Sequence, residues 1–301
     1  CMHHEQACGM AADGYSRVAK NHIGATISTS GPGATNLITA IACSWFDSIP
    51  VMFVSGQVFL NQTIRKTGLR QLGVQEIDII SLVKPITKYS VQVTNGKELK
   101  TELAKAYKIA VSGRMGPVLV DIPMDVQQEE VGEEIILPDL NNGVISDSES
   151  SIVVEKIKNQ FDNSERPLIL FGAGVGLGNA SVDVINFINS NSIPFVSSWN
   201  GSGFFDHDNE NYFGSIGVYG NRGANFLLQS ADKILVLGSR LDNRQRGNVK
   251  KFAPLADVLV LDIDQGELDK HKNDQNYEMH IFNFINSKKV FKNLMLNNVT
   301  N

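Results

Sequence analysis

The sequence predicts an α/β protein with two doubly wound domains, each built on a parallel sheet. Three observations support this fold class. A strand-like run, a glycine-rich turn and a helix-like run follow one another at 23–42, and the same order returns at 166–190. A short, continuously apolar run at 51–54 is typical of a parallel strand covered on both faces, and the run at 118–122 is expected to be another buried strand. The segment 129–150, rich in Glu, Ser and Asn, has the composition of a linker.

These patterns place the first domain at 1–128 and the second at 151–285, with the linker 129–150 between them and a tail at 286–301. The chain begins at Cys1, without an initiator methionine, in what reads as the end of a strand. We therefore expect a fragment whose first domain is truncated at its N-terminus.

The composition argues against several classes of partner. The net charge is −5 and the Lys and Arg residues are scattered, so the sequence predicts no basic surface patch that would bind nucleic acid or an anionic membrane. The longest apolar runs are far shorter than the ~20 residues that a membrane-spanning helix needs. Cys1, Cys8 and Cys43 lack CxxC or metal-ligand spacing. We expect reduced thiols, a cytoplasmic location and no metal site within this chain.

The first glycine turn is a candidate binding site. Ser30, Gly31 and Pro32 end the strand-like run, and a helix-like run starts at Asn36. Because glycine has no Cβ, such a turn lets backbone N–H groups and a helix N-terminus approach a ligand closely. The alternative is that the turn is only a tight connection.

Two further side chains are expected at the same edge of the sheet. Glu5 stands just before a helix-like run at 7–15, and Gln57 follows the strand at 51–54. Parallel strands end at one edge, so Glu5, Gln57 and the glycine turn would face the same crevice. The alternative for Glu5 is complementation of the helix dipole, worth roughly 0.3–1 kcal/mol.

The second domain contains a glycine loop at 172–178, which does not fit Gly-x-Gly-x-x-Gly but could accept a pyrophosphate. Arginines and acids follow the strands at 233–237 and 257–261, where a guanidinium group suits phosphate and a carboxylate suits a ribose hydroxyl. The alternative is local ion pairing. The candidate nucleotide-binding residues are Gly172, Ala173, Gly174, Arg240, Asp242, Arg244 and Asp262.

Six segments carry motifs in a specific order, namely 4–15, 29–36, 47–51, 56–58, 113–127 and 238–244. Together they resemble thiamine-diphosphate enzymes of the acetolactate synthase type. The first five resemble the pyrimidine-binding domain, and the sixth resembles the central domain. The resemblance covers nearly the whole chain and implies a truncated pyrimidine-binding domain followed by a Rossmann-like central domain.

The resemblance implies roles for individual residues. Glu5 would hydrogen-bond the aminopyrimidine ring of thiamine diphosphate and relay a proton, and burial would raise its pKa. Gln75 would lie near the reacting carbon. The central domain would offer a site for FAD. Mg²⁺ would be held by a third domain through a Gly-Asp-Gly motif, which this sequence lacks.

The implied reaction is decarboxylation of a 2-keto acid and ligation of the product to a second carbonyl compound. The working site would lie between two chains of a homodimer or homotetramer, so the fragment alone would be inactive. Val74 and Met124 replace the family's usual Phe and Lys, and Trp199 and Tyr219 replace its usual Leu and His. The alternatives are another thiamine-diphosphate 2-keto acid decarboxylase or lyase, and a non-catalytic nucleotide-binding module.

Overall fold

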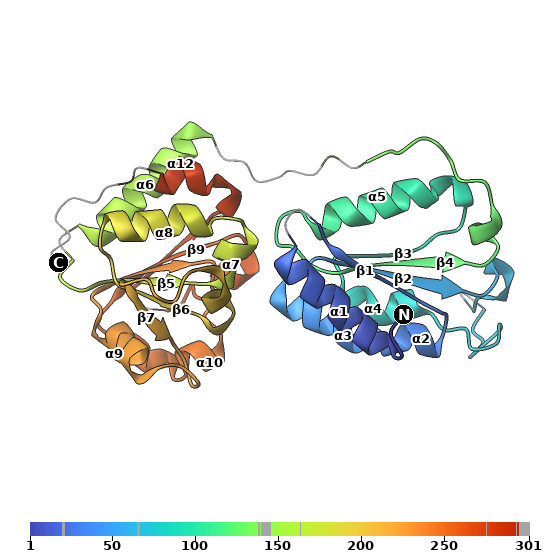
Figure 1. Ribbon diagram of the computed structural model, residues 1–301, viewed down its shortest axis with the longest axis horizontal. Helices are drawn as coiled ribbons and strands as arrows, with labels where there is room; N and C mark the ends of the chain where they lie inside the picture. The colour runs from blue at the N-terminus through green and yellow to red at the C-terminus, as the bar shows by residue number, and fades with distance from the viewer. Residues whose placement is uncertain are drawn as a thin grey trace. The chain divides into compact units, whose positions relative to one another are not determined.

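The computed structural model describes residues 1–19, 22–64, 67–137, 139, 146–162, 164–274, 276–292 and 294. They form two compact units, Cys1–Asn142 and Gly143–Asn301. Each unit has its own parallel sheet with helices on both faces, which confirms the predicted fold class (Figure 1). No helix in the described ranges is long and apolar enough to cross a membrane.

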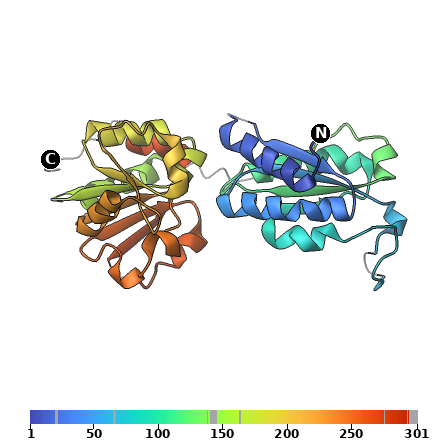
Figure 2. The same cartoon turned by 60° about the horizontal axis from the view of Figure 1, so that its bottom comes forward.

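The first unit contains a four-stranded sheet in the order β1-β2-β4-β3, and each neighbouring pair is parallel. Helices α1 and α3 lie on one face of the sheet and α5 lies on the other (Figures 1 and 2). The strands are β1 (Gly24–Ser28), β2 (Val51–Gln57), β3 (Tyr89–Gln92) and β4 (Val118–Pro123). The helices are α1 (Glu5–Val18), α2 (Pro32–Asn36), α3 (Ile38–Asp47), α4 (Ile79–Val83) and α5 (Leu99–Ala110).

Small residues and one polar cluster fix α1 against α3. A Cβ on Gly9 would stand only 2.5 Å from the Cβ of Ala40, so the two helices approach closely at this point. Further along α1, the Asp13 carboxylate accepts a hydrogen bond from Ser44 Oγ at 2.7 Å and pairs with Arg17 at 2.6 Å. These contacts hold α1, whose first residue is Glu5, at a defined position over the sheet.

Strand β1 lies at one edge of the sheet that the described residues form. Its residues are alternately buried and exposed, and Ile27 is 78% exposed. Among the described strands, β1 pairs only with β2. The central strands β2 and β4 contain the fully buried residues Val51, Phe53 and Val120. Position in the sheet therefore decides burial where composition does not.

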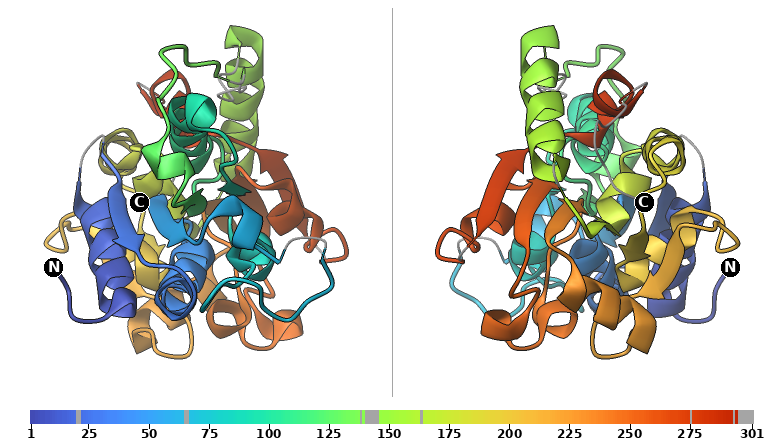
Figure 3. Two further views of the ribbon diagram at one scale, coloured as in Figure 1. Left: turned by 90° about the vertical axis from the view of Figure 1, so that its right-hand side faces the viewer. Right: turned by 90° about the vertical axis from the view of Figure 1, so that its left-hand side faces the viewer.

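The second unit contains a six-stranded parallel sheet in the order β10-β9-β8-β5-β6-β7. Helices α6, α8 and α12 lie on one face, and α9 and α10 lie on the other (Figure 3). The strands are β5 (Pro167–Phe171), β6 (Phe195–Ser197), β7 (Tyr212–Ser215), β8 (Lys233–Leu237), β9 (Asp257–Asp262) and β10 (Tyr277–Ile281). The helices are α6 (Asp147–Phe161), α7 (Ala173–Leu177), α8 (Ser181–Ser190), α9 (Arg222–Ser230), α10 (Asn243–Arg246), α11 (Gln265–Asp269) and α12 (Ser287–Phe291).

The glycine loop predicted at 172–178 is mostly helical, because it forms α7. Its glycines are required by close packing. A Cβ on Gly172 would stand 2.1 Å from the carbonyl oxygen of Gly238, and one on Gly176 would stand 2.1 Å from the ring of Phe204. Glycine at these positions lets α7 pack directly on the backbone that follows β8.

The limits of the two units differ in detail from the predicted domains. The acidic segment predicted as a linker packs partly on the first unit, where the Glu129 carboxylate accepts a hydrogen bond from the Gly96 N–H at 2.7 Å. Helix α6 begins with a capping box formed by Ser146 and Glu149. The second unit continues through α12, whose Val290 is only 1% exposed. Its core therefore extends beyond the predicted end at 285.

Candidate cofactor site

Glu5 lies beside the first glycine turn. One of its carboxylate oxygens accepts a hydrogen bond from Asn36 Nδ2 at 3.0 Å. The other oxygen, Oε1, lies 3.3 Å from the position that a Cβ on Gly33 would occupy. Asn36 ends α2, the short helix that follows the turn. The structure thus brings the predicted residues Glu5 and Asn36 into direct contact, although they are far apart in the sequence.

The turn is closed by the loop that carries Gln75. Gly31 has φ +56° and ψ −118°, a conformation that residues with a Cβ rarely adopt. A Cβ at this position would stand 1.9 Å from the carbonyl oxygen of Gln75. Gln75 itself has φ +58°, which is uncommon for a residue other than glycine. The backbones of two predicted site residues therefore lie close together.

The pKa of the Glu5 carboxyl lies below its ordinary value. The first cause is the hydrogen bond from Asn36, and the second is a hydrogen bond from the backbone N–H of Glu5, while desolvation acts in the opposite direction. The prediction that burial raises this pKa is wrong for this structure. The carboxylate is open to solvent here, so the donors that stabilise the charged form outweigh desolvation.

Gln57 is turned into the protein. It is 5% exposed, and its amide nitrogen donates to the carbonyl of Ile77 at 3.1 Å and to the carboxylate of Asp121 at 3.3 Å. Ser30 is half-buried and Pro32 is exposed, both next to the bend at Gly31. Contact of Gln57, Ser30 and Pro32 with a cofactor stays a prediction.

Glu76, next to Gln75 in the chain, is a buried acid that the sequence motifs did not single out. It is 6% exposed, and its Oε2 atom has no hydrogen-bond partner among the described residues. A buried acceptor without a donor is costly, so this atom is suited to a donor from a ligand or a water molecule. The only signal in the sequence is that Glu76 directly follows Gln75.

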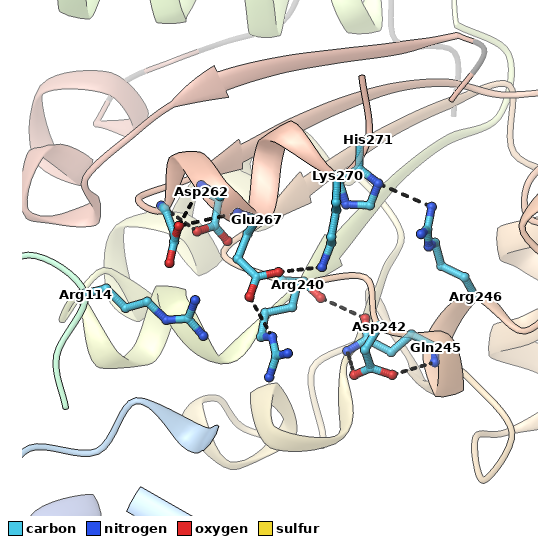
Figure 4. A network of polar contacts seen from close by, with 12 residues as sticks. Arg114, Arg240, Asp242, Gln245, Arg246, Asp262, Glu267, Lys270 and His271 are labelled. Carbon is cyan, nitrogen blue, oxygen red and sulfur yellow. Dashed lines mark hydrogen bonds and ion pairs between the residues drawn. The ribbon is translucent and has the colours of Figure 1, made fainter. Parts of the chain in front are cut away.

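The predicted nucleotide-binding residues of the second unit take part in local contacts (Figure 4). Arg240 Nε donates to one carboxylate oxygen of Glu267 at 2.9 Å, and Lys270 pairs with the other at 2.5 Å. Asp242 caps α10 by accepting hydrogen bonds from its first backbone N–H groups. Asp262 is 8% exposed and accepts a backbone hydrogen bond within its own loop. Local pairing, the alternative considered for these residues, is therefore present.

Arg244 belongs to an open surface made by three loops. Its guanidinium group lies over the ring of Tyr219, 5.7 Å from the centroid. Tyr219 meets Trp199 edge to face, with ring centroids 5.6 Å apart. Tyr219 is 65% exposed and Trp199 is 68% exposed. Because these loops follow β6, β7 and β8, the three side chains stand at the carboxyl edge of the sheet, where flat anionic ligands are commonly bound.

Comparison with known protein families matches both units. Residues 1–82 match the thiamine pyrophosphate enzyme N-terminal TPP binding domain, and residues 154–286 match the thiamine pyrophosphate enzyme central domain. The chain thus contains the N-terminal TPP binding domain and the central domain of thiamine pyrophosphate enzymes. The family resemblance read from the motifs is thereby confirmed.

Relatives of this chain include acetolactate synthase large subunits. The chain is 37% identical to the isozyme 2 large subunit of Escherichia coli K12, over 89% of this chain and 47% of that protein. It is 36% identical to a probable acetolactate synthase large subunit of Methanocaldococcus jannaschii, over 89% of this chain and 45% of that protein. It is 36% identical to the acetolactate synthase large subunit of Corynebacterium glutamicum, over 89% of this chain and 42% of that protein. The chain spans less than half the length of these relatives.

The two candidate regions of the chain fall within the two matched domains. Glu5, the glycine turn and Gln75 lie in the N-terminal match, and Arg240 and Arg244 lie in the central match. In the part of the chain that the structure describes, no group of three or more His, Cys, Asp or Glu side chains could hold a metal ion.

Proposed function

We propose that the polypeptide in which this chain occurs uses thiamine diphosphate to decarboxylate a 2-keto acid and to ligate the product to a second carbonyl compound. Similarity to acetolactate synthase large subunits supports this type of reaction. The observation that carries the role of this chain is the Glu5 carboxylate, held by Asn36 beside the glycine turn.

The residues at this edge fit a heterocyclic cofactor. A Cβ on Gly33 would stand 2.7 Å from Thr29 Cγ2 and 3.3 Å from Glu5 Oε1, so glycine lets the turn lie close to the carboxylate. Glu76 Oε2 is an acceptor that lacks a partner among the described residues. Thiamine diphosphate supplies an electron sink for decarboxylation when it is bound. Glu5 holds and returns a proton at its carboxylate, Asn36 orients that carboxylate, and Gln75 positions the substrate from the facing loop.

A second chain would complete the site. The Glu5 carboxylate is open to solvent within one chain, whereas proton transfer of this kind is favoured where water is excluded. We therefore propose a homodimer or homotetramer with the site between two chains, and Mg²⁺ ligands outside the described residues. On this proposal, the chain alone has no activity.

We propose FAD as a ligand of the second unit. The exposed side chains of Arg240 and Arg244 suit phosphate groups, and the rings of Trp199 and Tyr219 suit stacking against a flat ring system. Asp242 and the glycines of α7 have capping and packing contacts instead. Flavin absorbance in the purified polypeptide, and its loss in the variant Arg244→Met, would support this ligand. A spectrum without flavin would exclude it.

A second candidate is a 2-keto acid decarboxylase or lyase that uses the same cofactor without carboligation. It is favoured by two exposed apolar side chains near the site, Val74 at 85% and Met124 at 47% exposure. Met124 follows β4, and its N–H donates to the carbonyl of Gln57 at 3.1 Å, which places it at the same edge. Analysis of the products formed from pyruvate distinguishes a ligated hydroxy-ketone from a simple aldehyde.

The variant Glu5→Gln tests the proposed role of Glu5. Loss of a positioned proton-transfer group typically lowers turnover about 10²–10⁴-fold, and we expect a loss in this range in the complete polypeptide. Glu149→Gln is a matched control, because Glu149 also accepts hydrogen bonds in the first turn of a helix. If Glu5 only complements the helix dipole, both variants should lose a little stability and keep full turnover. That outcome would refute the proton-transfer role.

A further inference from the structure

A buried acid, Asp121, lies at the centre of the sheet in the first unit. It is fully buried in β4. Its register partners are Ser55 on β2 and Gln92 on β3, so the three residues form one row across the sheet close to the carboxyl edge. This acid has no part in the proposed reaction, and its position calls for another explanation.

The Asp121 carboxylate is surrounded by neutral donors. Its Oδ1 accepts from Ser55 Oγ at 2.6 Å, and its Oδ2 accepts from Gln92 Nε2 at 2.8 Å and from Gln57 Nε2 at 3.3 Å. Burial raises the pKa of this carboxyl, while the three hydrogen bonds act to lower it. A buried carboxyl group is retained at a cost in free energy, and such networks often define a single geometry.

Gln57 connects this carboxylate to the neighbouring loop. Its Nε2 also donates to the carbonyl of Ile77 at 3.1 Å, and its Oε1 accepts from the Val58 N–H at 3.0 Å. The opposite orientation of the amide would place its oxygen against both the carboxylate and a carbonyl oxygen. The amide orientation is therefore determined by its surroundings, and both of its N–H groups are used within the chain.

The loop anchored at Ile77 is the loop that closes on the glycine turn. Ile77 is two residues beyond Gln75, whose carbonyl oxygen occupies the space that a Cβ on Gly31 would need. Between them, the N–H of Glu76 donates to the carbonyl of Gly73 at 3.2 Å. A fixed carbonyl at Ile77 thus restricts where Gln75 can stand relative to the turn.

We propose that Asp121 is a positioning residue that, through Gln57, holds the loop 75–77 against the turn at Gly31. The contact itself is independent of the proposed function, and only its consequence for turnover rests on that function. Asp121 touches neither cofactor nor substrate, and it acts by keeping Gln75 in place.

Two variants separate positioning from a general structural role. Gln57→Leu and Gln92→Leu each remove one donor to the same oxygen of Asp121, but only Gln57 also reaches Ile77. Hydrogen exchange of the Glu76 amide in this chain reports on the loop, and amides of the second unit serve as the internal reference. We expect exchange roughly 5- to 10-fold faster in Gln57→Leu and unchanged in Gln92→Leu. Equal effects of the two variants would overturn the proposal.

Substitutions of Asp121 itself provide a rescue test. Asp121→Asn can direct its oxygen to the two glutamine amides and its nitrogen to Ser55 Oγ, so the Glu76 amide should keep its protection. Asp121→Leu removes every acceptor and should release the loop. The proposal fails if Asp121→Leu leaves the Glu76 amide as protected as in the unaltered chain.

Steady-state kinetics of the complete polypeptide show the consequence for catalysis. Gln57→Leu should lower kcat about 10-fold or more with little change in the KM of the keto acid, because Gln75 would be misplaced. Gln92→Leu should leave both constants unchanged, and a matching loss of kcat in Gln92→Leu would contradict the proposal. A polypeptide of unaltered sequence without thiamine-dependent activity would refute the proposed function and leave the exchange result standing.

Discussion

Replacement of Gly31 by alanine tests whether the glycine turn and the Gln75 loop are in contact. Gly31 has φ +56° and ψ −118°, and a Cβ there would stand 1.9 Å from the Gln75 carbonyl oxygen. Gly247 has φ 58° and ψ −117°, and a Cβ on this residue would meet no described atom within 4 Å, so it has the same backbone conformation in open space. Gly247→Ala is therefore a matched control.

The structure sets the size of the expected difference. Alanine in this backbone conformation costs roughly 1–3 kcal/mol at either position. At position 31, the contact with Gln75 must also open by about 1 Å to reach the 3.0 Å below which real Cβ contacts essentially do not occur. Such overpacking typically costs a further 1–3 kcal/mol or so. We expect Gly31→Ala to lose about 1–3 kcal/mol more than Gly247→Ala.

Native-state hydrogen exchange of the chain measures both losses. Core amides of β2 report the free energy of unfolding of the first unit, and core amides of β8 report that of the second. Gly31→Ala should also speed exchange of the Glu76 amide, because Gln75 has to move. Equal losses in Gly31→Ala and Gly247→Ala, with the Glu76 amide unchanged, would show that the turn and the loop do not press on one another.

Two further predictions concern pKa values. Asn36→Leu removes the main cause of the lowered pKa of Glu5, so the pKa of Glu5 should rise in an NMR pH titration. The pKa of Glu149 should not change. An unaltered titration of Glu5 would contradict its contact with Asn36. Burial lowers the pKa of Lys88 to about 8 from 10.5. Between these two pKa values the unfolded state binds more protons than the folded state. The free energy of unfolding should therefore rise as the pH increases from 8 to 10, and this gain should be lost as the pH falls back through 8. Urea denaturation should show this slope in the unaltered chain and a smaller slope in Lys88→Met, and parallel curves would refute the assignment.

Much of the fold could be predicted from local pattern. The runs at 51–54, 118–122, 233–237 and 257–261 correspond to β2, β4, β8 and β9, because strands in the middle of a parallel sheet are covered on both faces and therefore have a largely apolar sequence. Strands at the sheet margins lack that signal. β10 (Tyr277–Ile281) has only partly buried or exposed residues, so its sequence carries no apolar run.

The motifs by themselves indicated the family and predicted that Glu5, Gly31 and Gln75 belong to one site. Only the tertiary structure decided how they are held. It joins Asn36 to Glu5, places the Gln75 carbonyl against Gly31 and turns Gln57 inward to Asp121. The physical reason is that periodicity and turn chemistry act between near neighbours in the sequence, whereas hydrogen-bond partners and desolvation depend on residues that meet only when the strands align.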